Sequence, residues 1–197
     1  MSETRLHKAL RTIIEDLQSE GAAFALVGGL AVSARTEPRF TRDLDLAVHA
    51  VDDRQAEALV SSLLRRGYRI QAQVEQNAVG RLATARLKAP GPTAVDLDLL
   101  FASSMIEPEI VREATPLTLI EGLTLPVASL AHLIATKVLA RDDARRPQDH
   151  ADLVALLAEA DAADLEAARE ALRTIHSRGA HRGKDLLADL EALLPAP

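Results

Sequence analysis

Residues 24–48 read FALVGGLAVSARTEPRFTRDLDLAV: an apolar run, a pair of glycines, and two aspartates separated by one residue. A short apolar run that ends at glycine is typical of a buried strand whose backbone then turns tightly or approaches a ligand closely. The segment 30–35 predicts a helix, whose first amide groups face back toward Gly28 and Gly29 and form a site for an anion. Pro38 ends this helix, because the residue before a proline is pushed out of the helical region.

The two aspartates, Asp43 and Asp45, lie in an alternating segment, residues 41–48, that predicts a strand. Alternate side chains of a strand share one face, so both carboxylates are expected there, about 7 Å apart. Carboxylates this close repel each other unless a cation lies between them, and hard divalent ions take oxygen ligands of this kind. A pair like this on its own is more often a solvated strand edge than a metal site.

A second alternating run, residues 93–101 (TAVDLDLLF), carries two further acids, Asp96 and Asp98. If this strand lies beside the first one, either acid completes a cluster of three carboxylates. Both acids have the same parity, so alternation alone does not choose between them.

Together these pieces resemble the polymerase-beta-like nucleotidyltransferase superfamily, whose pattern is hG[GS], then Dh[DE]h, then a third acid on a strand. The stretch T-x-D-L-D-L at 41–46 and the region 130–157 are most similar to its AbiEii-type toxin branch, and the resemblance covers roughly residues 20–160. The family's third element reads like D-L-L-F-A, which favours Asp98 over Asp96. The resemblance implies a Mg²⁺-dependent nucleotidyltransferase that moves a nucleoside monophosphate from an NTP to an acceptor.

The resemblance also implies roles for the residues of these motifs. Asp43 and Asp45 are expected to hold metal ions on the nucleotide side of a two-metal site. Asp98 is expected to coordinate the second ion and to help deprotonate the acceptor hydroxyl. Gly28 and Gly29 are expected to offer backbone amides to the triphosphate, because glycine lets the chain come that close.

Three further side chains near the aspartates are candidates for nucleotide binding. Thr41 offers a hydroxyl, although a threonine that merely starts a strand reads the same way. Arg39 and Arg42 are placed to face phosphates, and the alternative is that both are solvated loop charges.

Two predicted helices, 127–141 and 148–160, carry the last candidates. Lys137 stands out in the apolar first helix, where composition alone favours a lysine that extends its charge to the helix edge. The family carries a lysine here in a motif like L-x-x-x-K-x-x-A, which implies that Lys137 binds the nucleotide. R-x-x-D-x-x-D-L resembles the family's second block, and this assigns a catalytic role to Asp149 and, with less support, to Asp152 on the same helix face.

The periodicity of the rest of the chain predicts an α+β fold: a small mixed β-sheet with helices on it, followed by a C-terminal helical region. We expect a nucleotidyltransferase core at 1–125 and the helical region at 126–197. Between 107 and 125 we expect a connection with one strand-like piece, 117–120. The remaining predicted helices are 2–20, 52–66, 162–175 and 186–194, and the remaining predicted strands are 68–74 and 82–87.

Composition narrows the classes of protein further. The 197 residues include no cysteine, which excludes disulfides and thiolate metal sites. No segment reads as a signal peptide or a bilayer span, so we expect a cytoplasmic protein without a membrane partner. The net charge of -6 argues against coating nucleic acid by charge alone. The basic stretch 176–184 is either a solvated connector or a grip for an RNA backbone.

The sequence therefore favours an NTP-dependent transferase acting on RNA, tRNA in particular, as the toxin of a type IV toxin-antitoxin pair with a cognate antitoxin protein as partner. One alternative is a catalytically silent member of the fold that binds nucleotide or a partner. A transferase with a protein or small-molecule acceptor is another. A glycosyltransferase that uses its DxD to hold a sugar nucleotide is disfavoured, because that fold needs a longer chain.

Overall fold

A computed structural model describes residues 4–76, 79–91, 95–142, 144 and 147–194. Within these residues the chain forms one mixed sheet in the order β3-β4-β5-β2-β1-β7-β6 with helices on it, which confirms the expected fold class. The strands are β1 (Phe24–Val27), β2 (Leu44–Val48), β3 (Arg69–Gln76), β4 (Arg81–Lys88), β5 (Asp96–Leu100), β6 (Thr115–Ile120) and β7 (Leu123–Val127). The helices are α1 (Arg5–Ser19), α2 (Gly28–Arg35), α3 (Asp53–Arg65), α4 (Glu107–Glu113), α5 (Leu130–Ala140), α6 (Pro147–Glu159), α7 (Ala162–Ser177) and α8 (Leu186–Glu191).

The centre of the sheet brings the two acidic strands together. β2 pairs antiparallel with β1 and parallel with β5. In the parallel pair Asp45 lies opposite Asp98, and in the antiparallel pair it lies opposite Val27, the last residue of β1. The glycine pair directly follows Val27, so the sheet register places Gly28 beside Asp45, with Asp98 one strand further away.

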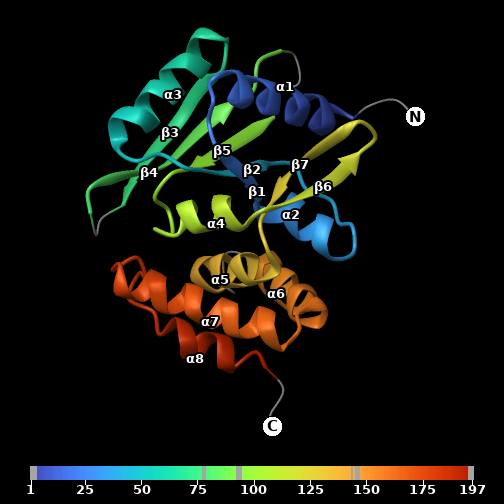
Figure 1. Cartoon of the computed structure of the whole chain (residues 1–197), viewed down its shortest axis with the longest axis vertical. Coiled ribbons are helices and arrows are strands. Elements are labelled where there is room, and N and C mark those ends of the chain that lie inside the picture. The colour runs from blue at the N-terminus through green and yellow to red at the C-terminus, as the bar shows by residue number, and fades with distance from the viewer. Residues whose placement is uncertain (1–3, 77–78, 92–94, 143, 145–146, 195–197) are drawn as a thin grey trace.

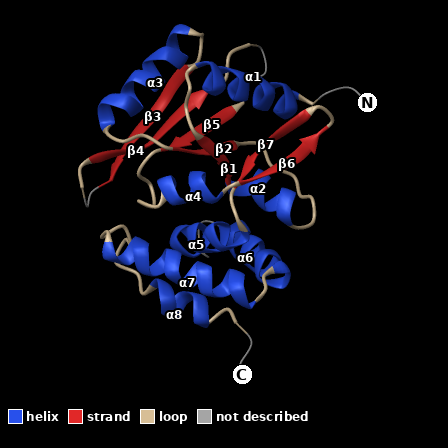
Figure 2. Cartoon of the chain, viewed as in Figure 1, coloured by secondary structure: helices blue, strands red, loops and turns tan. Residues whose placement is uncertain are grey.

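The helices form layers on the two faces of the sheet. Figure 1 shows α1 and α3 on one face and α2 and α4 on the other, with α5 to α8 gathered beyond α2 and α4. Colouring by secondary structure shows the same division, with the strands confined to the upper part and only helices below (Figure 2). The short helices α2 and α4 therefore lie between the sheet and the C-terminal helical region.

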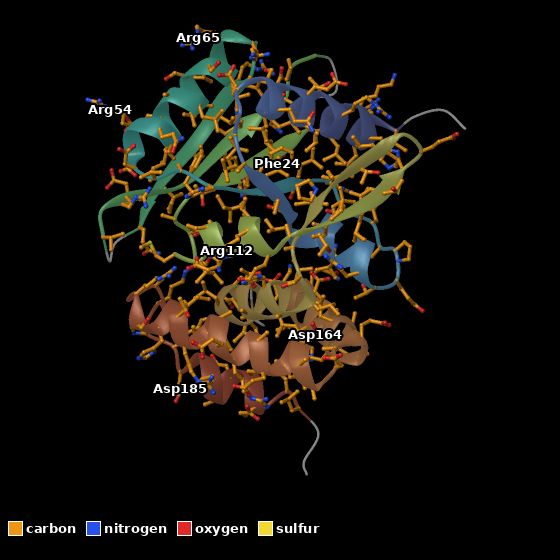
Figure 3. The ribbon with its side chains drawn as sticks, viewed as in Figure 1. Phe24, Arg54, Arg65, Arg112, Asp164 and Asp185 are labelled. Carbon is orange, nitrogen blue, oxygen red and sulfur yellow. The ribbon has the colours of Figure 1, made fainter. Side chains whose placement is uncertain are left out.

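One apolar core runs through these layers. It is built almost entirely from aliphatic side chains, as expected for a chain with 2% aromatic residues. Phe24 on β1 is buried at the middle of the molecule, whereas Arg54 and Arg65 project from α3 into solvent (Figure 3). Among the described helices, large hydrophobic side chains are exposed at Leu64 and Val154 only, and most charged side chains face solvent, although Asp149 and Asp152 are buried.

The strand-like piece expected at 117–120 lies within β6, but the expectation of little else between 107 and 125 is wrong, because this segment also forms α4 and most of β7. α4 has only seven residues, too few for a helical period to stand out, and Pro108 falls in its first turn. Pro126 reads as a stop before a helix, yet it lies within β7, opposite Pro116 of the edge strand β6. The next helix accordingly starts at Leu130 and not at 127, with the Ser129 hydroxyl accepting from the third amide of the helix at 3.2 Å.

Two boundaries in the acidic stretch also differ from expectation. α2 begins at Gly28 and not at 30, so both glycines belong to the helix. β2 begins at Leu44 and not at 41, because its pairing with β1 stops opposite Asp45 and its pairing with β5 starts at Leu44. Thr41 and Asp43 therefore lie in the loop before the strand, and the expected shared strand face of Asp43 and Asp45 is replaced by a loop residue next to a strand residue.

The basic stretch 176–184 binds the protein itself. Arg178 forms an ion pair with Glu109 of α4 at 2.6 Å. Lys184 Nζ donates to two carbonyl groups at the C-terminal end of α5, at 2.9 and 2.6 Å, where a cation also suits the helix dipole. These contacts fasten the α7–α8 loop to α4 and α5, and they leave few of its charges for an RNA backbone.

Candidate active site

The glycine pair is a place of close approach. Gly28 has φ of +65°, a conformation that favours glycine, and a Cβ at this position would lie 1.9 Å from Asp45 Oδ2. A Cβ at Gly29 would lie 2.7 Å from Arg39 Nη2 and 3.1 Å from Thr41 Oγ1. The absence of both side chains is therefore what lets these three groups approach the start of α2.

We expect Gly28→Ala to cost both stability and activity. The added methyl group meets the Asp45 carboxylate and displaces it, in addition to the backbone strain of about 1–3 kcal/mol for a non-glycine residue at positive φ. Gly21→Ala is the matched control, because Gly21 has φ of +66° with nothing within 4 Å of the added Cβ. Thermal unfolding and nucleotidyl-transfer assays should show the strain in both variants and the loss of transfer in Gly28→Ala alone. Equal activity in the two variants would contradict the close approach.

The carboxylates at the site repel one another. Burial, followed by the negative charge of Asp98, raises the pKa of Asp45 to about 6; Asp43 adds to this, while Lys137 and the Gly29 backbone N–H lower it. The electrostatic field at Asp45 thus comes from the same residues that the sequence singled out. The structure brings Asp43, Asp45, Asp98 and Lys137 into one neighbourhood, although they come from a loop, two strands and a helix.

Asp98 is held by a residue that the sequence analysis missed, Arg86 of β4. The guanidinium donates Nε to Asp98 Oδ1 at 2.7 Å and Nη2 to Asp98 Oδ2 at 2.5 Å. Asp96 instead pairs with Lys88, at 2.7 Å. The side chain of Arg86 is 51% exposed and that of Asp98 15%, so the arginine covers its partner from the solvent side. Arg86 lies in β4, next to the edge strand β3, where a charged side chain is usually solvated. Nothing in the sequence therefore indicated its contact with Asp98.

The donor set suits a hard divalent cation, because the Asp45 carboxylate lies where the negative charges of Asp98 and Asp43 oppose its ionisation. Among the residues that the structure describes, however, no three His, Asp or Glu side chains stand in a metal-binding arrangement. The Arg86 guanidinium supplies the positive charge at Asp98 instead. The residues that fit a cation are therefore Asp45 and Asp43, with Asp98 available once Arg86 has moved.

A buried ionic network links the core to the helical region. Asp152 of α6 is 1% exposed and accepts from Arg39 Nη2 at 2.7 Å, and its other oxygen lies 2.6 Å from Arg39 Nε. Lys137 Nζ lies 2.7 Å from Asp152 and 2.6 Å from Asp149. Lys137 is only 13% exposed, so it is not a lysine with its charge extended into solvent. Spacing showed only that Asp149 and Asp152 share a helix face; the partner in the loop before β2 was not visible from the sequence.

Two of three comparisons with known proteins find proteins that are similar to this chain. The family model "Nucleotidyl transferase AbiEii toxin, Type IV TA system" matches residues 10–196. The search of curated proteins finds no match to the chain.

Solved structures of similar fold cover most of the chain. They include an antigenic nucleotidyltransferase-like protein from Paracoccidioides brasiliensis (22% identity, 96% of this chain and 93% of that one, TM-score 0.57). The antibiotic-resistance factor ANT(2'')-Ia is also similar (19% identity, 91% and 97% covered, TM-score 0.61). A third is the lincomycin-bound lincosamide antibiotic adenylyltransferase LnuA (16% identity, 81% and 100% covered, TM-score 0.53). At these identities the likeness shows the fold.

Proposed function

Since the chain belongs to the AbiEii nucleotidyltransferase family, we propose that it moves a nucleoside monophosphate from an NTP to the end of an RNA, tRNA in particular, as the toxin of a type IV toxin-antitoxin pair. One observation supports nucleotidyl transfer at this site: Asp45 lies in register with Asp98 on the neighbouring parallel strand and directly beside the glycine-led start of α2. A helix start next to paired carboxylates is what phosphate binding and metal binding at one site require.

The start of α2 is the place for the triphosphate. Its N-cap, Val27, makes no side-chain hydrogen bond to the helix, and the Gly29 amide faces the Asp45 carboxylate. These amides and the positive end of the helix dipole favour an anion. Gly28 and Gly29 let phosphate oxygens reach the backbone, and the Thr41 hydroxyl and the Arg39 guanidinium border the same turn.

Asp43, Asp45 and Asp98 are the residues that would hold Mg²⁺. The bound ions would neutralise charge on the phosphates and on the leaving pyrophosphate. In the transfer, an acceptor hydroxyl oxygen forms a bond to the α-phosphorus, and the bond from that phosphorus to pyrophosphate breaks. Asp98 takes the hydroxyl proton after Arg86 has turned away, which its half-exposed side chain allows.

Lys137 and Asp149 act together in this proposal. Asp149 and Asp152 hold the Lys137 ammonium in place, and the charge of Lys137 reaches Asp45. A lysine positioned in this way binds a nucleotide phosphate as a fixed point charge. In the described part of the chain, no helix is long and apolar enough to cross a membrane. We propose a cytoplasmic enzyme restrained by a cognate antitoxin, as the family's type IV designation suggests.

The test is incubation of the purified protein with Mg²⁺, each α-labelled NTP in turn, and total tRNA. Label on RNA with the wild type, and none with an Asp43→Ala/Asp45→Ala variant, would support the proposal and identify the preferred base. Label on the protein itself would redirect it to protein nucleotidylation. No label on RNA with any NTP would overturn the RNA acceptor.

A small-molecule acceptor is the second candidate. It is favoured by the structural likeness to ANT(2'')-Ia, known in complex with adenylyl-2''-tobramycin, and to the lincosamide antibiotic adenylyltransferase LnuA. Transfer to a panel of aminoglycosides and lincosamides, with no transfer to RNA, would support it. A protein that binds NTP but transfers to none of these acceptors would fit the catalytically silent alternative.

Mg²⁺ should stabilise the metal-free protein through the carboxylates. A ligand that binds only the folded state adds about 2.7 kcal/mol at 100 times its Kd. We expect the melting temperature to rise with Mg²⁺ in the wild type and to stay unchanged in Asp45→Asn. In Arg86→Gln the rise should begin at lower Mg²⁺, because the guanidinium no longer competes for Asp98. An identical Mg²⁺ response in all three proteins would exclude these residues as the ligands.

A further inference from the structure

The loop between α2 and β2 presents an aromatic ring to solvent. Phe40 is 77% exposed, in a chain that has three phenylalanines, one tyrosine and no tryptophan. The Arg42 guanidinium lies over this ring, with its Cζ 5.4 Å from the ring centroid. The Phe40 ring lies beside a proposed active site, and its exposure leaves a face available to a ligand.

The backbone under Phe40 is anchored, although the ring is exposed. Arg39 Nη1 donates to the Phe40 carbonyl at 3.2 Å, and the Arg39 backbone N–H donates to the Ser33 hydroxyl of α2 at 3.3 Å. The same Arg39 side chain is fixed by the buried Asp152. The backbone that carries the ring is therefore fixed by a network that includes Arg39, a proposed nucleotide-binding residue.

A cavity of about 780 Å³ adjoins this ring. Its lining includes Phe40, Arg42, Arg5 and Asp43, together with apolar side chains of α1 and β6. The volume lies within the range of about 300–1,000 Å³ that is usual for small-ligand sites. Asp43 belongs both to this cavity and to the proposed catalytic carboxylates, so a group held in the cavity borders the reacting centre.

The lining combines an aromatic face, arginines and an apolar floor. Three arginines, at positions 5, 39 and 42, line it against two aspartates, in a protein whose net charge is -6. In the described part of the chain, no hydrogen bond or ion pair holds the Arg42 guanidinium, whose one recorded contact is with the Phe40 ring. Aromatic rings and guanidinium planes stack on nucleobases, and free arginines attract phosphates. A single-stranded nucleic acid end has both features.

We propose that Phe40 and Arg42 form a stacking platform for the unpaired terminal base of the RNA acceptor, whose adjoining phosphate faces Arg5. This inference rests on the proposed RNA acceptor and adds how that acceptor is held. In this proposal the platform takes the acceptor base, while the triphosphate of the NTP lies at the start of α2. Its contribution is to substrate affinity, so its loss raises KM for RNA and leaves NTP binding unchanged.

Phe40→Trp supplies a direct readout, because the substituted chain then contains a single tryptophan. We would titrate it with a short single-stranded RNA and with the same RNA lacking its terminal base. Stacking should quench the fluorescence with the intact RNA, and loss of the base should weaken binding by roughly tenfold. Equal quenching by both RNAs, or none by either, would overturn the proposal. Quenching by a polypeptide partner and not by RNA would overturn it in favour of a protein contact.

Phe40→Leu separates stacking from mere apolar contact, and Val51→Ala is the matched control, since Val51 is 74% exposed in another loop. Phe40→Leu should raise KM for RNA several-fold with unchanged Kd for NTP, and Val51→Ala should change neither. Weaker NTP binding in Phe40→Leu would overturn the assignment to the acceptor base. The fluorescence titration needs no turnover, so quenching without any transfer to RNA would count against the proposed function while the platform stands. Transfer that Phe40→Leu leaves unaffected would count against the platform alone.

Discussion

Replacing Asp45 by asparagine is expected to reduce nucleotidyl transfer by about 10³-fold or more while the protein remains folded. The substitution removes one charged ligand from the proposed metal site, and charge stabilisation by metal ions contributes several kcal/mol to the transition state of phosphoryl transfer. The side chain keeps its shape, so the contact with the Gly29 amide and the turn at Gly28 survive. The measurement is the initial rate of transfer under saturating NTP, Mg²⁺ and acceptor.

The same substitution should increase stability in the absence of metal. Burial and the neighbouring Asp98 raise the pKa of Asp45 from 3.8 to about 6, so its ionised form costs folding free energy. The shift corresponds to roughly 3 kcal/mol, an upper bound because the carboxylate is partly exposed. Because the folded pKa is raised, the wild type loses this free energy as the pH rises from about 4 through 6. The stability gain of Asp45→Asn should grow over that window and stay constant above pH 7.

Denaturation of both proteins in EDTA at several pH values measures this gain. Asp43→Asn is the comparison, because Asp43 is exposed in the loop and its charge has less effect on stability. An asparagine variant that is inactive and also less stable than the wild type at pH 7 would indicate a structural role for the Asp45 carboxylate. A functional site often lowers the stability of the folded protein. If Asp45 belongs to such a site, the Asp45→Asn variant should be inactive and more stable than the wild type.

The sequence could predict the local parts of this site because local rules govern them. Alternation in 44–48 determines that Leu44 and Leu46 face the core, and the buried strands confirm it. The glycine pair predicted a close approach of the backbone, and Asp45 is the group that approaches. The sequence left open whether the strand predicted at 93–101 lies beside the first one, and β5 does so with Asp98 opposite Asp45.

What the sequence could not predict depends on contacts between distant segments. Arg86 contacts Asp98 only because β4 is the antiparallel neighbour of β5. The sequence of neither strand predicts which strand it pairs with. The sequence allowed Arg39 to be a phosphate ligand or a solvated loop charge, and the packing of α6 on α2 places Asp152 beside it. The edge strand β6 and its neighbour β7 were missed in part because a proline within a strand resembles a proline in a turn.

Replacing Asp152 by alanine should cause the largest loss of stability, about 3–5 kcal/mol, because it leaves two cations without their shared anion in a buried place. The Asp152 carboxylate is 1% exposed and lies 2.6 Å from Arg39 Nε and 2.7 Å from Lys137 Nζ. Urea denaturation at pH 7 measures the loss. Glu166→Ala is the matched control, since Glu166 also pairs with two arginines but is 62% exposed on α7, where such pairs contribute at most about 1 kcal/mol.

The pH dependence of this loss distinguishes an ionic role from mere packing. Burial alone would raise the pKa of Asp152, but hydrogen bonds from Arg39 and Lys137 outweigh it and lower the pKa below 3.8. A lowered folded pKa gives stability that is present at neutral pH and lost as the pH falls below about 4. The difference between wild type and Asp152→Ala should therefore shrink in acid, whereas a cavity cost would not change. Asp152 joins Arg39, in the loop of Phe40 and Thr41, to Lys137 of α5. The variant should therefore also lose transfer activity at temperatures where it is still folded.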